Sequence, residues 1–126
     1  MSRACPTGCG TVYKLSPGKS GSWTFTVLHK FTGEGDGYYP AGGLVQDAKG
    51  NLYGVTGGNN CWGGGCAGSV YEVTPGGVET VLYKFKGKTD GQFPGGALIL
   101  DDKGNLYGTT YSGGASGYGT VFMVTP

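Results

Sequence analysis

The sequence predicts an all-β fold made of about two four-stranded antiparallel β-propeller blades. Glycine and proline are abundant, with 29 Gly and 6 Pro among 126 residues, and both residue types disfavour long helices. Short apolar runs alternate with polar residues or are rich in β-branched and aromatic side chains, as expected of strands separated by turns. The pattern recurs after 54 residues, close to the period of propeller repeats.

The repeat is clearest in one long motif. Residues 36–54 and 90–108 are identical at 12 of 19 positions. A second motif, a glycine followed by Thr or Ser, Val and an aromatic residue, occurs three times and begins at Gly10, Gly68 and Gly119. Departures from the regular spacing fall in the connections, so we expect the strands themselves to keep their register.

One complete repeat contains four predicted strands joined by tight turns. The strands cover residues 43–47, 51–56, 69–74 and 79–85, and the first two recur at 97–101 and 105–110. The first two strands are joined by a hairpin turn that starts at Asp47, or at Asp101 in the second copy. An Asp oxygen can accept backbone N–H groups in such a turn, and the glycine that ends it tolerates positive φ. The Pro75-Gly-Gly77 segment closes the second hairpin.

These strands divide the single repeat module, residues 1–126, into three parts. Residues 10–31 form a partial blade (third and fourth strands), residues 43–85 a full blade, and residues 97–126 a partial blade (first to third strands). Two blades do not close a ring, which takes about four to eight, and open edges leave backbone groups unpaired. We therefore expect a ring of about six or eight blades, completed by oligomerisation of identical chains or by a longer parent chain.

Three consecutive motifs resemble those of a known bacterial repeat family. In order they are G-T-V-F/Y-x-L/V-T/S-P, T-V-L-Y/H-K-F-x-G and D-G-x-x-P-x-G-x-L-x-x-D-x-x-G-N-L-Y-G-x-T, and they cover residues 10–126. They are similar to the GloVer-type, or choice-of-anchor, tandem repeat of bacterial surface and secreted proteins. The resemblance implies an extracellular or cell-surface propeller module that brings no catalytic motif.

Composition excludes several kinds of partner. Only 13% of residues are charged and the net charge is +1, so no broad field attracts nucleic acid or an anionic membrane. No apolar run approaches the roughly 18 residues that span a bilayer, and we expect no membrane insertion. No signal peptide is visible in residues 1–10, and no cofactor is expected.

The four cysteines lie in two local pairs. Cys5 and Cys9 precede the first copy of the third strand, and Cys61 and Cys66 precede the second. In an exported chain this arrangement favours two small disulfide loops. A four-cysteine zinc site is the alternative, but the spacings fit the common zinc pattern poorly, and we expect no metal.

Catalytic residues are sparse. The single histidine, His29, has Tyr83 as its repeat counterpart, which favours packing over a general base. Asp36 and Asp90 are equivalent and each precedes a glycine, so a turn role is favoured. A hydrolase of lactonase or glycosidase type is the alternative function, and it would need Asp36, Asp90 or Glu72 to meet in a channel.

Aromatic and amide side chains are enriched in the connections, where they suit sugar rings. The candidates are Tyr38, Tyr39, Asn59, Asn60, Trp62, Tyr111 and Tyr118. Alternatively, Tyr38 and Tyr39 plug the gap between neighbouring blades. The sequence thus predicts a non-catalytic extracellular scaffold or recognition module, in its most concrete form a lectin-like carbohydrate binder acting through several weak sites.

Overall fold

The computed structural model describes residues 5, 8–57 and 67–126, and this part of the chain is all β, as predicted. Its ten strands and one three-residue 3₁₀ turn are β1 (Thr11–Pro17), η1 (Lys19–Gly21), β2 (Trp23–Lys30), β3 (Pro40–Gln46), β4 (Leu52–Thr56), β5 (Ser69–Val73), β6 (Glu79–Lys84), β7 (Gln92–Pro94), β8 (Ile99–Leu100), β9 (Leu106–Ser112) and β10 (Thr120–Val124).

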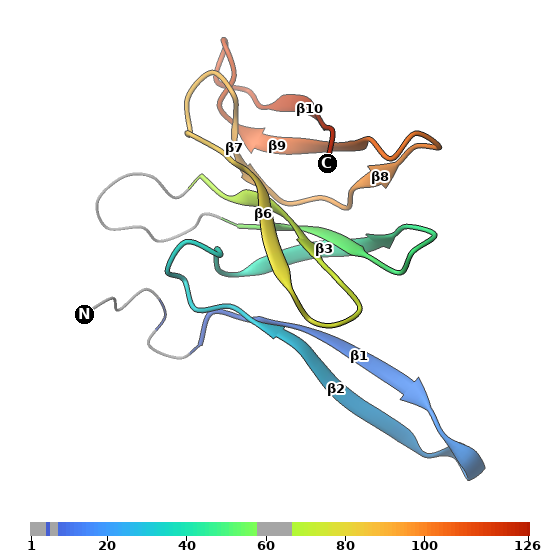
Figure 1. Cartoon of the computed structure of the whole chain (residues 1–126). Coiled ribbons are helices and arrows are strands. Elements are labelled where there is room, and N and C mark those ends of the chain that lie inside the picture. The colour runs from blue at the N-terminus through green and yellow to red at the C-terminus, as the bar shows by residue number, and fades with distance from the viewer. Residues whose placement is uncertain (1–4, 6–7, 58–66) are drawn as a thin grey trace.

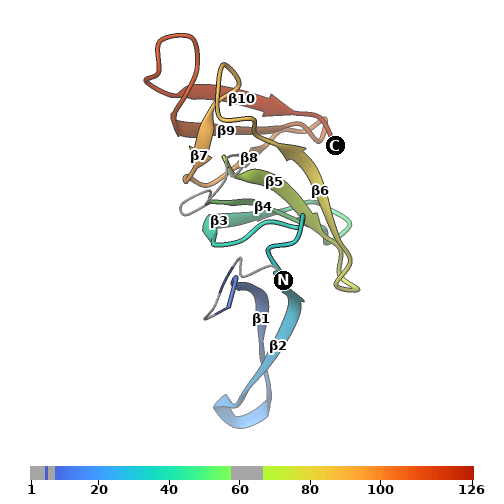
Figure 2. The same cartoon turned by 90° about the vertical axis from the view of Figure 1, so that its left-hand side faces the viewer.

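The strands form three antiparallel sheets that follow one another along the molecule (Figure 1 and Figure 2). β1 and β2 form the N-terminal hairpin, and β3-β4-β5-β6 form the middle sheet in chain order. In the C-terminal sheet β7 and β8 both pair with β9, which pairs with β10. The described residues form an open row of sheets and no closed ring (Figure 2). The propeller arrangement therefore stays a prediction.

The first strand of the repeat differs from its predicted bounds. β3 begins at Pro40, before the predicted start at residue 43, and its register shifts between Ala41 and Val45. In the second copy the strand is split into β7 and β8, so the prediction of residues 97–101 missed β7. Both interruptions fall at Gly-Gly pairs, where a strand is weakened and a bulge is favoured. The other three predicted strands agree with β4, β5 and β6 to within a residue at each end.

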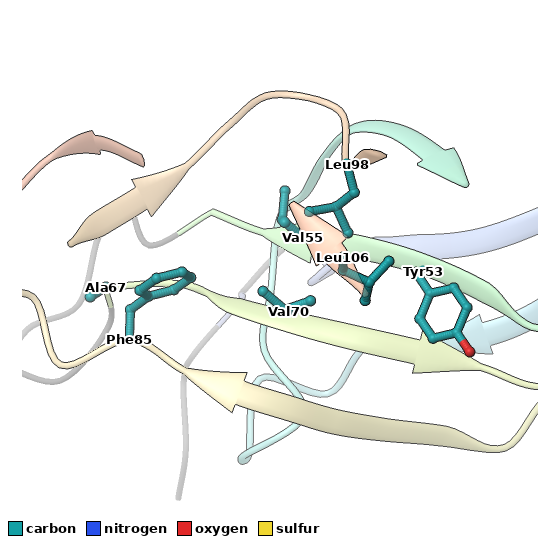
Figure 3. Close-up of a cluster of buried hydrophobic side chains, with 7 residues drawn as sticks. All are labelled: Tyr53, Val55, Ala67, Val70, Phe85, Leu98 and Leu106. Carbon is teal, nitrogen blue, oxygen red and sulfur yellow. The ribbon is translucent and has the colours of Figure 1, made fainter. Parts of the chain in front are cut away.

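Two hydrophobic clusters lie between the sheets. One joins the middle and C-terminal sheets (Figure 3) and contains Tyr53, Val55, Ala67, Val70, Phe85, Leu98 and Leu106. The other joins the N-terminal hairpin to the middle sheet and contains Cys9, Val12, Phe31, Tyr38, Tyr71 and Val73. Successive side chains of a strand point to opposite faces, so β5 supplies Val70 to one cluster and Tyr71 to the other. This burial on both faces explains why apolar residues stand next to each other in β5, as Val70 and Tyr71 do, instead of alternating strictly with polar ones.

The same aromatic contact recurs at both inter-sheet contacts. The rings of Phe31 and Tyr71 lie edge to face with centroids 5.1 Å apart. Their repeat counterparts, Phe85 and Phe122, also lie 5.1 Å apart in a similar orientation. The 54-residue repeat of the sequence is therefore a repeat of packing as well as of strands.

The hairpin turns at Asp47 and Asp101 use the same set of hydrogen bonds. Oδ1 of Asp101 accepts the backbone N–H groups of Lys103 and Asn105, at 2.9 and 2.8 Å. Its Oδ2 accepts from Asn105 Nδ2 and from the Tyr107 hydroxyl, both at 2.9 Å. The side-chain amide of Asn105, with its backbone N–H, is the main cause that lowers the pKa of Asp101 from 3.8 to about 2. In the D-x-K-G-N-L-Y segment, backbone N–H groups, the Asn side chain and the Tyr hydroxyl thus all donate hydrogen bonds to the Asp carboxylate at its start.

This turn predicts acid sensitivity. The folded-state pKa of Asp101 is depressed, so the unfolded chain binds the proton more readily and stability rises with pH. The urea midpoint of the wild type should be constant at neutral pH and fall as the pH drops from about 4 towards 2. Asp101→Asn should lower the midpoint at pH 7 and make the acid decline shallower.

The control is Asp102→Asn, because Asp102 is the exposed neighbour on the same turn. It should change neither the midpoint nor its pH dependence. Equal pH profiles for Asp101→Asn and the wild type would contradict the assignment.

Candidate functional site

A cavity of about 490 Å³ lies between the middle and C-terminal sheets, beside the C-terminal ends of β4 and β9. It is lined by Ala41, Gly57, Phe93, Pro94, Gly95, Tyr111 and Ser112. Its lining is mainly apolar, and Tyr111 and Ser112 are the lining residues that carry hydroxyl groups. The combination of ring faces and nearby polar groups is typical of small-molecule sites.

The exposed tyrosines of the C-terminal sheet lie at this end. The sequence predicts Tyr111 in a connection, but the residue belongs to β9, which extends to Ser112. Tyr111 lines the cavity, yet 85% of the residue is exposed. Tyr118 precedes β10 and is 92% exposed. Aromatic residues normally bury most of their area, so both rings are available to a ligand.

Tyr38 and Tyr39 have separate positions. Tyr38 is only 7% exposed and lies in the cluster between the N-terminal hairpin and the middle sheet. Its place matches the alternative in which it fills the gap between neighbouring units. Tyr39 is 38% exposed and has φ of 54°. Its backbone N–H donates to the carbonyl oxygen of Cys9 at 2.8 Å, which joins it to the preceding segment.

Phe93 is a cavity residue that sequence reasoning did not select. It is the repeat counterpart of Tyr39, with φ of 59°, and its N–H donates to the carbonyl oxygen of Ala67 at 2.7 Å. A non-glycine residue at positive φ is uncommon and often belongs to a functional site. The sequence does contain a signal for Phe93: it aligns with Tyr39 at the 54-residue period, so both repeats have an aromatic residue at this position.

Three of the amide and aromatic candidates, Asn59, Asn60 and Trp62, lie outside the described residues, as do Cys61 and Cys66. The predicted disulfide between Cys5 and Cys9 is present, with a Cα–Cα distance of 5.1 Å. It closes a loop directly before β1, beside the cluster that contains Cys9.

Asp36 holds its own loop together. Its carboxylate accepts the Thr32 N–H, the Thr32 hydroxyl and the Gly33 N–H, each at 2.9 Å. Its Oδ2 also lies 3.2 Å from Nε2 of His29, which is in edge contact with the ring of Phe31. Burial raises the pKa of Asp36, but these hydrogen bonds outweigh it and hold the pKa below the usual value.

Asp90 repeats this arrangement with a tyrosine in place of the histidine. Its Oδ2 accepts the hydroxyl of Tyr83 at 2.7 Å and the N–H of Lys86 at 2.9 Å. His29 in one repeat and Tyr83 in the other both contact the Asp carboxylate through a polar group, but only the histidine is a base near neutral pH. This explains why the position accepts both residues: it orients the loop that follows the fourth strand.

The carboxylates named for the hydrolase alternative lie on separate segments of the chain. Among the described residues there is no group of three or more His, Cys, Asp or Glu side chains that could hold a metal ion. Glu72 lies on β5 and Asp36 on the loop before β3. A different acid lies near Asp36: burial, with the charge of Asp36, raises the pKa of Glu79 to about 7.

A family model describes the chain over its whole length. The model of the Gloeobacter/Verrucomicrobia repeat matches residues 1–126. The chain belongs to this repeat family. The resemblance of its three motifs to a bacterial tandem repeat is thereby confirmed, whereas the choice-of-anchor label stays a prediction. No curated protein matches the sequence.

This member of the Gloeobacter/Verrucomicrobia repeat family has a sequence period of 54 residues. In this chain the repeat builds sheets, turns and inter-sheet contacts, as shown above. Across residues 5, 8–57 and 67–126 no helix has the length and apolar character needed to cross a bilayer.

Proposed function

We propose that this chain is a non-catalytic recognition module of the cell exterior that binds carbohydrate in the cavity beside Tyr111. The observation that carries the proposal is the position of Tyr111. Its ring is 85% exposed at the edge of a cavity of about 490 Å³ that also contains Phe93 and Pro94. Apolar ring faces beside hydroxyl and backbone groups complement the C–H surface and the hydroxyls of a sugar.

The repeat supports binding through several weak sites. Tyr39 and Phe93 are equivalent residues with nearly the same φ, so each repeat presents an aromatic residue at this point. Weak sites that act together gain affinity without new contacts. The disulfide between Cys5 and Cys9 supports a location outside the cytosol, where disulfides persist.

Binding is preferred to hydrolysis because the candidate acids already have structural partners. Asp36 accepts three hydrogen bonds from its own loop, and Asp90 accepts from Tyr83 and Lys86. Each of these carboxylates holds its own loop, and neither lines the cavity beside Tyr111.

Carbohydrate binding is tested by a glycan array, followed by titration of the best sugar. Tyr111→Ala should weaken binding about tenfold, which corresponds to about 1.4 kcal/mol of lost contact. Trp62→Ala tests the candidate that was chosen from sequence alone. The matched control is Trp23→Ala, because Trp23 is an exposed aromatic residue at the far end of the N-terminal hairpin.

The control should bind like the wild type. The proposal fails if no sugar binds at millimolar concentration or if Tyr111→Ala binds as well as the wild type. Release of product from a bound glycoside or lactone would favour the hydrolase instead, and Asp36→Asn combined with Asp90→Asn should then abolish turnover.

A further inference from the structure

The three sheets occupy different strand positions of the same repeat. The middle sheet has all four positions, as β3 to β6. By the sequence repeat, β1 and β2 are counterparts of β5 and β6, the third and fourth strands. The C-terminal sheet contains counterparts of the first three strands, ending with β10. Among the described residues, the hairpin therefore lacks the first two positions and the C-terminal sheet lacks the fourth.

Among the described residues β10 has a neighbouring strand on one side only, and a cavity lies on its open side. This cavity measures about 220 Å³ and is lined by Tyr83, Phe85, Asp90, Phe122, Met123 and Val124. At the equivalent place of the middle sheet, β6 is present: Tyr71 pairs with Val81, and Val73 pairs with Glu79. Phe122 and Val124 are the counterparts of Tyr71 and Val73, and their strand has no such partner in the described chain.

The N-terminal hairpin presents an uncovered apolar face. Its cross-strand pairs Tyr13 with Val27 and Leu15 with Phe25 share this face, and all four residues are exposed. Phe25 is 60% exposed and Val27 is 44% exposed. The hairpin projects away from the other sheets, as Figure 1 and Figure 2 both show.

The two-stranded N-terminal hairpin covers only part of the face of the middle sheet that it packs against. Leu44 of β3 is 42% exposed beside a cavity of about 420 Å³ that Val12 and Tyr13 also line. Its repeat counterpart, Leu98, is only 3% exposed because it packs against the middle sheet, in the cluster with Tyr53 and Val55. Leu44 lacks the equivalent cover because the hairpin contains no strand at that position.

We propose that copies of this chain join head to tail, with the N-terminal hairpin of one copy completing the C-terminal sheet of another. β2 then takes the fourth-strand position, with Val27 opposite Phe122 and Phe25 opposite Val124, by analogy with the pairing of β5 and β6. β1 and β10 are copies of the third strand, so β10 keeps that place and β1 leaves it. Such an exchange of equivalent elements is a low-cost route to assembly.

A second copy is the favoured occupant because the two incomplete sheets complement each other. The hairpin offers the strand position that the C-terminal sheet lacks, and the C-terminal sheet offers the two positions that the hairpin lacks. The resulting contacts would continue those already present between the sheets, where Phe31 meets Tyr71 and Phe85 meets Phe122. Each copy would then contribute two complete sheets, so a ring of six or eight sheets holds about three or four copies.

Native mass spectrometry, with light scattering after size exclusion, tests the assembly. The wild type at micromolar concentration should have the mass of about three or four copies. A donor variant, Phe25→Asp with Val27→Asp, should have the mass of one copy. An acceptor variant, Val121→Asp with Met123→Asp, should also have the mass of one copy. Val121 is the counterpart of Val12, which is buried between the hairpin and the middle sheet, so we expect Val121 to be buried against the next copy in the assembly.

Mixing the two variants in equal amounts distinguishes a head-to-tail contact from a symmetric one. Each variant retains one intact half of the contact, so the mixture should form a species of two copies and nothing larger. The substituted side chains are exposed or partly exposed in the single copy, and circular dichroism checks that each variant folds. The matched control is Val78→Asp, on the exposed turn before β6, which should assemble like the wild type.

The inference is overturned if the wild type has the mass of one copy. It is also overturned if the donor variant assembles like the wild type, or if the mixed variants form no species of two copies. The test is independent of the glycan site, because it measures mass and involves no sugar.

Discussion

Replacement of Gly68 by alanine is expected to lower the free energy of unfolding by about 2–5 kcal/mol. Gly68 has φ of 96°, a region that residues with a Cβ rarely adopt. A Cβ there would lie 2.5 Å from the carbonyl oxygen of Thr56 and 2.5 Å from Cδ of Pro94. Backbone strain and steric overlap therefore act together, and urea denaturation measures their sum.

The matched control is Gly104→Ala. Gly104 has φ of 87°, but no atom lies within 4 Å of the position its Cβ would occupy. This substitution should therefore cost only the strain, about 1–2 kcal/mol. Equal losses in the two variants would show that the close approach between Gly68, β4 and Pro94 is unimportant.

The second large effect is expected for Leu106→Ala, at about 2–5 kcal/mol. Leu106 is completely buried, with 0% exposure, in the cluster between the middle and C-terminal sheets (Figure 3). Truncation leaves a cavity at a position where two sheets meet, so the packing of both should weaken. The urea midpoint should fall accordingly, since total stabilities of small domains are only about 5–15 kcal/mol.

Val78→Ala is the control for this substitution. Val78 is 62% exposed on the turn before β6, and its truncation should change stability by less than about 0.5 kcal/mol. A loss for Leu106→Ala as small as that of Val78→Ala would contradict the assignment of this cluster as the core.

The strands and turns were predictable because their signals are local. The β-branched and aromatic run around Val70 and Tyr71 is a local signal, and so is the Asp101 turn with its Asn and Tyr partners. The Cys5–Cys9 disulfide was predictable for the same reason. Local spacing is enough where the interacting groups are neighbours in the chain.

The site was less predictable because its residues come from separate segments. The sequence alone indicates Tyr111 as a candidate. Phe93 and Pro94 line the same cavity only because β7 pairs with β9. Tyr38 and Tyr39 are adjacent and chemically alike, yet one is buried and the other is partly exposed. Tyr38 is buried because it packs against the N-terminal hairpin. A contact between distant segments of this kind cannot be predicted from the local sequence pattern.

The sequence by itself determined the all-β class, the repeat and the hairpin turns, because each depends on residue type and short-range spacing. Only the tertiary structure decided which of two equivalent residues in the repeats is buried. Leu44 and Leu98 occupy the same place in the repeat, but they are 42% and 3% exposed. The physical reason is that burial depends on the sheet lying opposite: Leu98 faces the four-stranded middle sheet, whereas Leu44 lies beside the two-stranded hairpin.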